Sequence, residues 1–332
     1  MGDRADGGAI YAGGDVVVMN STISGNSTNN LDSEGGAIAA EGSVSITDST
    51  FSGNSTDGGG SDGGAVYAAG ELVVLGSLFS GNSTGTPTTS RGGAIFSDDD
   101  ATVAGSTFVG NSTGGSNSDG GAIFGDLNTT LTIVDSTFSG NFTSRFGAQG
   151  GAVHTRGSLA VENSTFSGNN SFSHGGAIAT EGTTEIAHST ITGNHAGNTG
   201  GGFWNYNDPV TINHTIIADN TADDGNADLN PSSGSLTVIH SLIGDNDGVA
   251  LAEAPTADAQ GNLIGSSAGG GVIDPLLAPL ADNGGPTQTH VPLAGSPAID
   301  AGDPAFTPPP NNDQRGAAFP RIIGGRIDNG AV

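Results

Sequence analysis

The chain has 332 residues and a formal net charge of −27, because 34 acidic residues stand against 7 basic ones. All seven basic residues are arginine, which argues against nucleic-acid binding and against docking on anionic lipid, since both need a basic surface. The chain has no cysteine for disulfides or thiolate chemistry, and no run of 18 apolar residues that could cross a membrane. A lysine-free, acidic surface fits a secreted protein, a salty habitat or weak binding of divalent cations, and these alternatives stay open.

A repeat of 25 to 30 residues runs through residues 7 to 246. Regular self-similarity at this period is the signature of a solenoid, in which each unit buries a narrow face against its neighbours. The first eight units open on a Gly-Gly pair, and the pairs begin at Gly7, Gly35, Gly63, Gly92, Gly120, Gly150, Gly175 and Gly200. Each unit closes on an asparagine, at Asn26, Asn54, Asn82, Asn111, Asn141, Asn169, Asn194, Asn220 and Asn246.

Three short apolar segments recur within each unit. In the second unit they are Ile38 after Gly-Gly-Ala, Val44 with Ile46, and Phe51 three residues before the asparagine. Apolar residues two apart are typical of strands, whereas helical spacing is missing and glycine interrupts every stretch. The sequence therefore predicts an all-β, right-handed parallel β-helix of about nine coils, with three short strands per coil.

A hydroxyl residue stands five positions before every closing asparagine. Nine hydroxyls in nine units, beside nine asparagines, predict two stacked columns that form hydrogen-bonded ladders at a turn. A catalytic serine among nine equivalents has no special partner in the sequence, so a structural role is the favoured interpretation. The hydroxyl residues are Ser21, Ser49, Ser77, Ser106, Ser136, Ser164, Ser189, Thr215 and Ser241.

The repeats give way after residue 246 to an irregular, proline-rich region. We interpret residues 1–246 as the regular solenoid and residues 247–332 as a final irregular coil with a C-terminal cap, because a solenoid end exposes unpaired backbone and apolar core. Four charged residues of this region could form ion pairs that hold the cap: Asp313, Arg315, Arg321 and Asp328. The sequence shows no N-terminal cap and no signal peptide, which suggests an excised fragment or an end that stacks head-to-tail on another chain in a fibre.

The repeat residues resemble those of a known family. Gly35-Gly36-Ala37-Ile38 with Phe51-Ser52-Gly53-Asn54 resembles the repeats of chlamydial polymorphic outer-membrane proteins, and the pattern recurs through most of residues 7–246. Those proteins are surface adhesins exported as autotransporters, but no autotransporter barrel follows here, so that export route does not carry over.

The tail resembles a second family, the region that ends the repeats of bacterial choice-of-anchor surface proteins. The matching stretches are residues 282–289, 295–302, 313–316 and 327–331, together with Arg321. This resemblance implies a bacterial protein at the cell surface or secreted from the cell, and it implies no particular activity.

The residue after the first inward position of each unit should point to solvent, which predicts an outward strip on one sheet. Aromatic rings in such a strip could stack on sugar rings, although aromatic residues also favour strands and stack along β-helices for structural reasons. The strip comprises Tyr11, Tyr67, Phe96, Phe124, His154 and Trp204, with alanine at positions 39 and 179.

The loops after each asparagine vary in length, and they are a second candidate for ligand contact. Solenoids often place specificity in such loops, although drift in the length of exposed turns is the plainer interpretation. The side chains of interest in these loops are Arg91, Phe142, Arg145, Phe146, Phe172 and His174.

Several turns are rich in aspartate. Calcium prefers several carboxylates at one loop, so it is the one metal that these turns suggest, although solvated acidic turns are the plainer interpretation and no known calcium motif is matched. The acidic turns contain Asp98, Asp99 and Asp100, then Asp223, Asp224 and Asp228, and finally Asp245 with Asp247.

Catalysis is disfavoured by the sequence. Many β-helices cleave polysaccharides, but that chemistry needs clustered carboxylates with a cation or a paired-carboxylate cleft, and no such pair stands out beside Arg91, Arg145 or Arg156. We therefore expect a non-catalytic extracellular or cell-surface protein that needs no cofactor and acts as an adhesin, a stalk or a self-assembling fibre unit. The alternatives are a glycan-binding module that uses the aromatic strip and a polysaccharide lyase or hydrolase.

Overall fold

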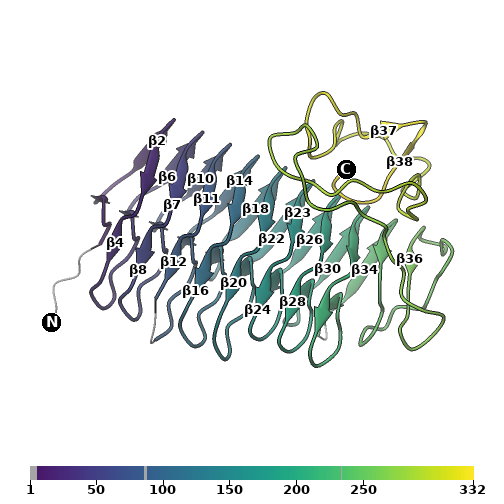
Figure 1. The fold of residues 1–332 in the computed structure, drawn as a ribbon, viewed down its shortest axis with the longest axis horizontal. Coiled ribbons are helices and arrows are strands. Elements are labelled where there is room, and N and C mark those ends of the chain that lie inside the picture. The colour runs from purple at the N-terminus through teal and green to yellow at the C-terminus, as the bar shows by residue number, and fades with distance from the viewer. Residues whose placement is uncertain (1–5, 86–87, 233) are drawn as a thin grey trace.

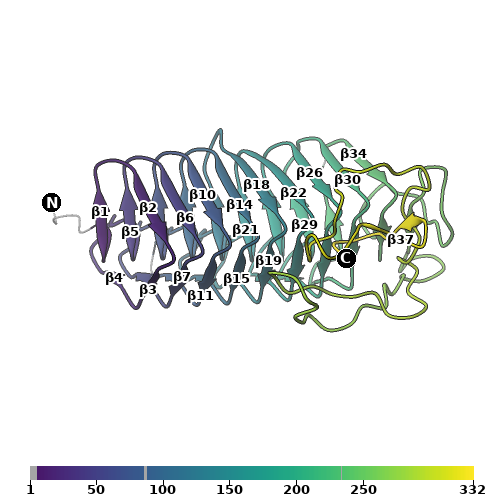
Figure 2. The ribbon, with the colours of Figure 1, turned by 90° about the horizontal axis from the view of Figure 1, so that it is seen from above.

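The computed structural model describes residues 6–85, 88–232 and 234–332, and it shows a right-handed parallel β-helix. Figures 1 and 2 show a straight rod of stacked coils, with a separate lobe against one side near the C-terminal end. No helix occurs among the described residues. The fold prediction is confirmed, although the first eight coils each contain four short strands rather than three.

Four parallel sheets run along the rod, and each of the first eight coils contributes one strand to each sheet in turn. Sheet A consists of β1 (Ile10–Ala12), β5 (Ile38–Ala40), β9 (Val66–Ala68), β13 (Ile95–Ser97), β17 (Ile123–Gly125), β21 (Val153–Thr155), β25 (Ile178–Thr180), β29 (Phe203–Asn205) and β33 (Leu229–Asn230). Sheet B consists of β2 (Val16–Met19), β6 (Val44–Thr47), β10 (Leu72–Leu75), β14 (Ala101–Ala104), β18 (Thr130–Val134), β22 (Ser158–Glu162), β26 (Thr184–Ala187), β30 (Val210–Asn213) and β34 (Leu236–Ile239).

Sheets C and D complete the coil. Sheet C consists of β3 (Thr22–Ser24), β7 (Thr50–Ser52), β11 (Leu78–Ser80), β15 (Thr107–Val109), β19 (Thr137–Ser139), β23 (Thr165–Ser167), β27 (Thr190–Thr192), β31 (Ile216–Ala218), β35 (Leu242–Ile243) and β36 (Leu263–Ile264). Sheet D, which the sequence did not predict, consists of β4 (Ser27–Thr28), β8 (Ser55–Thr56), β12 (Ser83–Thr84), β16 (Ser112–Thr113), β20 (Phe142–Thr143), β24 (Asn170–Ser171), β28 (His195–Ala196) and β32 (Thr221–Ala222).

Equivalent residues of successive coils pair in register, so each inward position forms a column through the core. The column three residues before the asparagines is a stack of parallel phenyl rings, with centroids 4.7 to 4.9 Å apart from Phe51 to Phe166. The Gly-Gly pair is needed where sheet D meets sheet A. Gly92 has a φ of +65°, and a Cβ on Gly93 would collide with the carbonyl oxygen of Gly121 in the next coil.

The asparagine column is a continuous, buried hydrogen-bonded ladder. Asn82 donates from its side chain to Asn111 Oδ1 (2.9 Å), and Asn111 donates in the same way to Asn141 Oδ1 (2.9 Å). The ladder ends differently from the prediction, because Asn220 donates to Asp228 Oδ1 (2.9 Å) and Asn246 lies outside it. Asp228 stands directly before β33, and its buried carboxylate fills the place in the ladder that Asn246 was expected to take.

The hydroxyl column is a second ladder, in which backbone N–H groups donate to side chains of the next coil. Ser106 N donates to Ser136 Oγ (3.1 Å), and Ser136 N donates to Ser164 Oγ (3.1 Å). The series continues to Thr215 N, which donates to Ser241 Oγ (3.1 Å). These hydroxyls occupy the turn between sheets B and C.

The region after residue 246 has two parts, of which only the first caps the core. Val249, Leu251 and Ala254 pack against the core at its C-terminal end, where β36 adds a last strand to sheet C. Residues 276–332, here called the C-terminal lobe, fold back along the side of the rod (Figures 1 and 2). The lobe contains β37 (Ile322–Ile323) and β38 (Arg326–Ile327), which pair antiparallel.

The lobe is held mostly by hydrogen bonds rather than by the predicted ion pairs. Asp313 and Arg315 do form an ion pair within the lobe (2.6 Å). The buried Arg321 instead donates from Nη2 to Asn163 Oδ1 (2.8 Å), and Asp328 Oδ1 accepts from the backbone N–H of Asp300 (2.6 Å).

Candidate functional site

The six residues of the predicted outward strip lie on the outer face of sheet A, in register from strand to strand. The prediction that they face solvent is wrong for four of them, since the exposed fractions are 3% for Phe96, 0% for Phe124, 1% for His154 and 8% for Trp204. Tyr11 is 58% exposed and Tyr67 is partly exposed. The strip is therefore no continuous aromatic platform, and glycan contact stays a prediction at its N-terminal end.

Long side chains from both edges of sheet A cover the strip. The guanidinium carbon of Arg91 lies 5.0 Å from the ring centroid of Phe124, and that of Arg156 lies 5.7 Å from the same centroid. His174 stacks on Trp204 at 5.1 Å between centroids. Because the rings also stack on one another along the strip, little of their surface remains for water or a ligand.

Buried His154 lies between two carboxylates. Its Nδ1 is 3.3 Å from Asp119 Oδ2, and its Nε2 is 3.5 Å from Glu181 Oε1. Burial alone would lower the pKa of His154, but Asp119 and Glu181 together raise it to about 9. The imidazole therefore carries a positive charge at neutral pH.

This charge should make the stability of the chain depend on pH. A pKa raised from 6.5 to about 9 contributes about 3 kcal/mol below pH 6.5, and this contribution is lost as the pH rises through about 9. We expect the free energy of unfolding, measured with urea, to fall across this interval in the wild type and to fall by about 3 kcal/mol less in His154→Gln. Parallel profiles for the two proteins would contradict a charged His154.

Further carboxylates gather on the same face. Tyr67 donates from its hydroxyl to Asp98 Oδ2 (2.5 Å), and Asp62 Oδ1 accepts from the backbone N–H of Arg91 (2.6 Å). Burial raises the pKa of Asp62 to about 7, despite the opposing effect of Arg91. Shifted pKa values of this kind are found at functional sites and also in structural ion-pair networks.

We call this cluster the sheet A face: Asp62, Arg91, Asp98, Asp119, Asp126, His154, Arg156 and Glu181. Its carboxylates could accept hydrogen bonds from hydroxyl groups, but most of its charges already pair within the cluster, as Arg156 does with Asp126 (3.1 Å). Most of these acids were not predicted from the sequence. The signal was present, because they stand either directly before a Gly-Gly pair or six residues after its first glycine.

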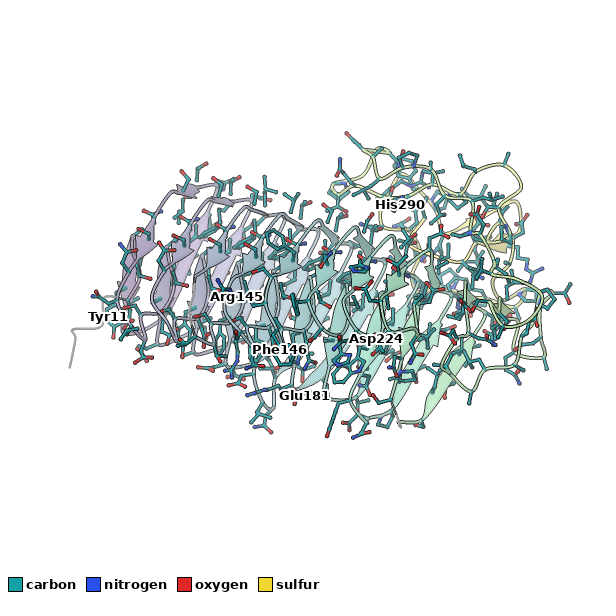
Figure 3. The ribbon with its side chains drawn as sticks, turned by 60° about the horizontal axis from the view of Figure 1, so that its bottom comes forward. Tyr11, Arg145, Phe146, Glu181, Asp224 and His290 are labelled. Carbon is teal, nitrogen blue, oxygen red and sulfur yellow. The ribbon has the colours of Figure 1, made fainter. Side chains whose placement is uncertain are left out.

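The variable loops, in contrast, present aromatic side chains to solvent. Exposed fractions are 41% for Phe142, 76% for Phe146 and 47% for Phe172. Phe142 lies on the outer side of β20, and Phe172 follows β24 with its N–H donated to Thr143 Oγ1 (3.1 Å). Figure 3 shows Arg145 and Phe146 well away from the lobe that carries His290. We call these three phenylalanines with Arg145 the loop edge.

In the part of the chain that the structure describes, the acidic turns do not form one cluster of carboxylates. Both oxygens of Asp228 accept hydrogen bonds, Oδ1 from Asn220 and Oδ2 from the backbone N–H of Asp245 (2.7 Å), and its role as a calcium ligand stays a prediction. Within the described ranges, no group of three or more histidine, aspartate or glutamate residues is placed to hold a metal ion. Calcium binding at Asp98, Asp99 and Asp100, or at Asp223 and Asp224, stays a prediction.

A pocket of about 330 Å³ opens where the repeat pattern breaks, at the corner between sheets C and D. Its lining includes Asp219, Asp228 and Asp245. Asp219 and Asp245 stand directly before the closing asparagines, where earlier coils have glycine. Burial raises the pKa of Asp228 to about 7. The pocket thus combines hydrogen-bonding carboxylates with the apolar wall of Val272 and Ile273.

The fold and these sites define a right-handed parallel β-helix protein. A family described as the right-handed β-helix region matches residues 3–166, so this part of the chain is similar to that family. Searches of curated proteins and of solved structures found no significant match. The described part of the chain contains no helix with the length and apolarity that a membrane crossing requires.

Proposed function

We propose that the chain is a non-catalytic β-helix displayed on a bacterial cell surface or secreted, where it acts as an adhesin that attaches through the loop edge. The observation that carries the proposal is the exposure of Phe142, Phe146 and Phe172 on two consecutive coils, in a protein that buries most of its other phenylalanines. Contiguous exposed apolar side chains usually mark an interaction site. Tight stacking of the coils beneath them gives the loops a rigid support.

Charge at the loop edge also favours a binding role. Residues 136–161 contain no aspartate or glutamate, in a chain with 34 of them. Among the described arginines, only the Arg145 side chain takes part in no ion pair, hydrogen bond or ring contact. A guanidinium beside exposed rings suits a sugar that carries a carboxylate or sulfate group.

The two family resemblances support the proposed location. The Gly-Gly-Ala and Phe-x-x-Asn pattern resembles repeats of surface adhesins, and the tail resembles surface proteins that are anchored to cells. Both resemblances favour presentation of the rod outside the cell.

An array of neutral and acidic bacterial and host polysaccharides tests the proposal. We expect the wild type to bind at least one polysaccharide and the triple variant Phe142→Ser, Phe146→Ser, Phe172→Ser to bind at least tenfold more weakly, because each ring contact contributes about 0.5–1.5 kcal/mol. Leu31→Ser is the matched control, since Leu31 is 70% exposed in the equivalent loop of the first coil. Unchanged binding by the triple variant would rule out the loop edge.

The pocket beside Asp228 favours a second candidate function, the cleavage of a polysaccharide. A buried carboxyl with a pKa of about 7 suits a general acid, and Asp219 and Asp245 are the neighbouring carboxylates. New reducing ends or an unsaturated product on the same polysaccharides, abolished in Asp245→Asn, would replace the adhesin proposal with this one.

A further inference from the structure

Three histidines stack at the corner between sheets B and C in the last coils. His188, His214 and His240 occupy equivalent positions, each with a φ of 44° to 49°. Their rings are stacked, with centroids 4.9 Å apart for the first pair and 5.2 Å apart for the second. Asparagine and aspartate fill the same column in several earlier coils, for example Asn20, Asp48 and Asn163, so the backbone does not require histidine there.

The C-terminal lobe covers this histidine stack. Phe306 places its ring 5.4 Å from the rings of His188 and His214, in edge-on geometry. The backbone N–H of Asp303 donates to His214 Nε2 (3.0 Å), and Gly330 N donates to the His214 carbonyl (2.8 Å). His188 and His214 are buried beneath these contacts.

We propose that the histidine stack is an acid-sensitive latch, which holds the lobe on the rod while the imidazoles are neutral and releases it when they are protonated. The contact with Asp303 requires a lone pair on His214 Nε2. Protonation would turn this acceptor into a donor that faces another donor. Two stacked imidazolium rings would also repel each other, with the guanidinium of Arg321 already beside them.

Most charged groups around the stack favour neutral imidazoles. Burial, together with Arg321 and a neighbouring histidine, lowers the pKa of His188 to about 2 and that of His214 to about 4. Asp303 opposes this weakly from the lobe, where it lies 3.9 Å from His240 Nε2. Because the pKa of each free imidazole is near 6.5, docking is strongest above this pH and weakens as the pH falls below it.

Other titratable groups at the interface modify the response. Burial lowers the pKa of His290, whose Nε2 lies 2.9 Å from Ser167 Oγ, so this lobe residue adds to the acid sensitivity. Burial raises the pKa values of Asp135 and Asp328, and their protonation would strengthen docking at lower pH. Glu162 and Asp313 face Arg321, whose pKa of about 10 keeps it charged throughout. The net effect between pH 7.5 and 5.5 is therefore release.

Release would uncover an apolar surface that belongs to no other part of the rod. Ile216, Ala218 and Leu242 point outward from sheet C and pack against Ala298 of the lobe as a small core of their own. Earlier coils carry mostly threonine at the position of Ile216, as in Thr22, Thr50 and Thr107. Mild acid would thus expose an apolar patch on the outer face of sheet C.

Amide hydrogen exchange on the whole chain tests the latch. Two histidines each change the docking equilibrium by about tenfold per pH unit below 6.5. After correction for intrinsic exchange, we expect protection of lobe peptides from residues 290–332 to fall about a hundredfold between pH 7.5 and 5.5. Peptides from residues 100–134, in the regular coils, should keep their protection and serve as the internal control. Lobe protection that is independent of pH overturns the proposal.

Variants of the histidines test whether the stack causes the pH dependence of lobe protection. We expect the double variant His188→Asn, His214→Asn to lose most of the pH response, because asparagine is native to this column and does not titrate. His195→Asn is the matched control, since His195 lies on sheet D and should leave the response intact. If the double variant loses protection in all coils, His214→Asn alone should still reduce the response about tenfold. A variant that folds and responds like the wild type overturns the proposal.

Discussion

Replacing Asn111 by alanine should lower the free energy of unfolding by about 4 kcal/mol, since several buried polar groups would lose their partners at once. Asn111 Nδ2 donates to the Phe79 carbonyl (3.0 Å) and to Asn141 Oδ1 (2.9 Å). Its Oδ1 accepts from the backbone N–H and the Nδ2 of Asn82 (3.0 and 2.9 Å). None of these atoms can reach water in the folded chain, because Asn82, Asn111 and Asn141 are all fully buried.

Urea unfolding followed by circular dichroism measures this loss. Asn246→Ala is the matched control, since Asn246 closes its repeat in the sequence but makes only one side-chain hydrogen bond, to the Leu251 carbonyl (2.8 Å). We expect the control to lose about 1 kcal/mol or less. Equal losses in the two variants would show that the ladder contributes no more than an isolated hydrogen bond.

The register of the coils could be read from the sequence, because every inward position repeats. Ile38 belongs to a column that recurs three residues after the first glycine of each pair, and Phe51 and Asn54 belong to columns that recur 16 and 19 residues after it in most coils. Stacking in register forces such columns to face inward. Sheet D was missed for the opposite reason. Its strands, such as Ser55–Thr56, are two polar residues long and show no apolar alternation, so only the pairing of the coils reveals them.

The same columns do not predict which side chains of the candidate site are exposed to solvent. The pattern correctly placed Phe124 on the outer face of sheet A, but its exposure depends on how far Arg91 and Arg156 reach across that face. Likewise, the sequence gives no sign that a histidine at the corner between sheets B and C differs from other turn residues, because the segment that covers it lies far along the chain. Contacts such as Asp303 with His214 join residues 89 positions apart, and no periodicity encodes them.

The phenylalanine stack should be the second large contributor to stability. Phe108 is fully buried, with its ring centroid 4.9 Å from that of Phe79 and 4.7 Å from that of Phe138. We expect Phe108→Ala to lower the free energy of unfolding by about 3–5 kcal/mol, because the neighbouring rings are held by their own coils and cannot collapse into the cavity. Loss of the two ring contacts adds to the loss of buried apolar area.

Two further variants separate the size of the side chain from its aromatic character. Isoleucine occupies this column in other coils, at Ile23, Ile191 and Ile217, so Phe108→Ile should fold and lose about half as much as Phe108→Ala. Phe146→Ala removes a side chain that is 76% exposed and should change stability by less than about 0.5 kcal/mol. A small loss in Phe108→Ala would mean that the coils can close over the missing ring, and the core would then be held mainly by the asparagine and hydroxyl ladders.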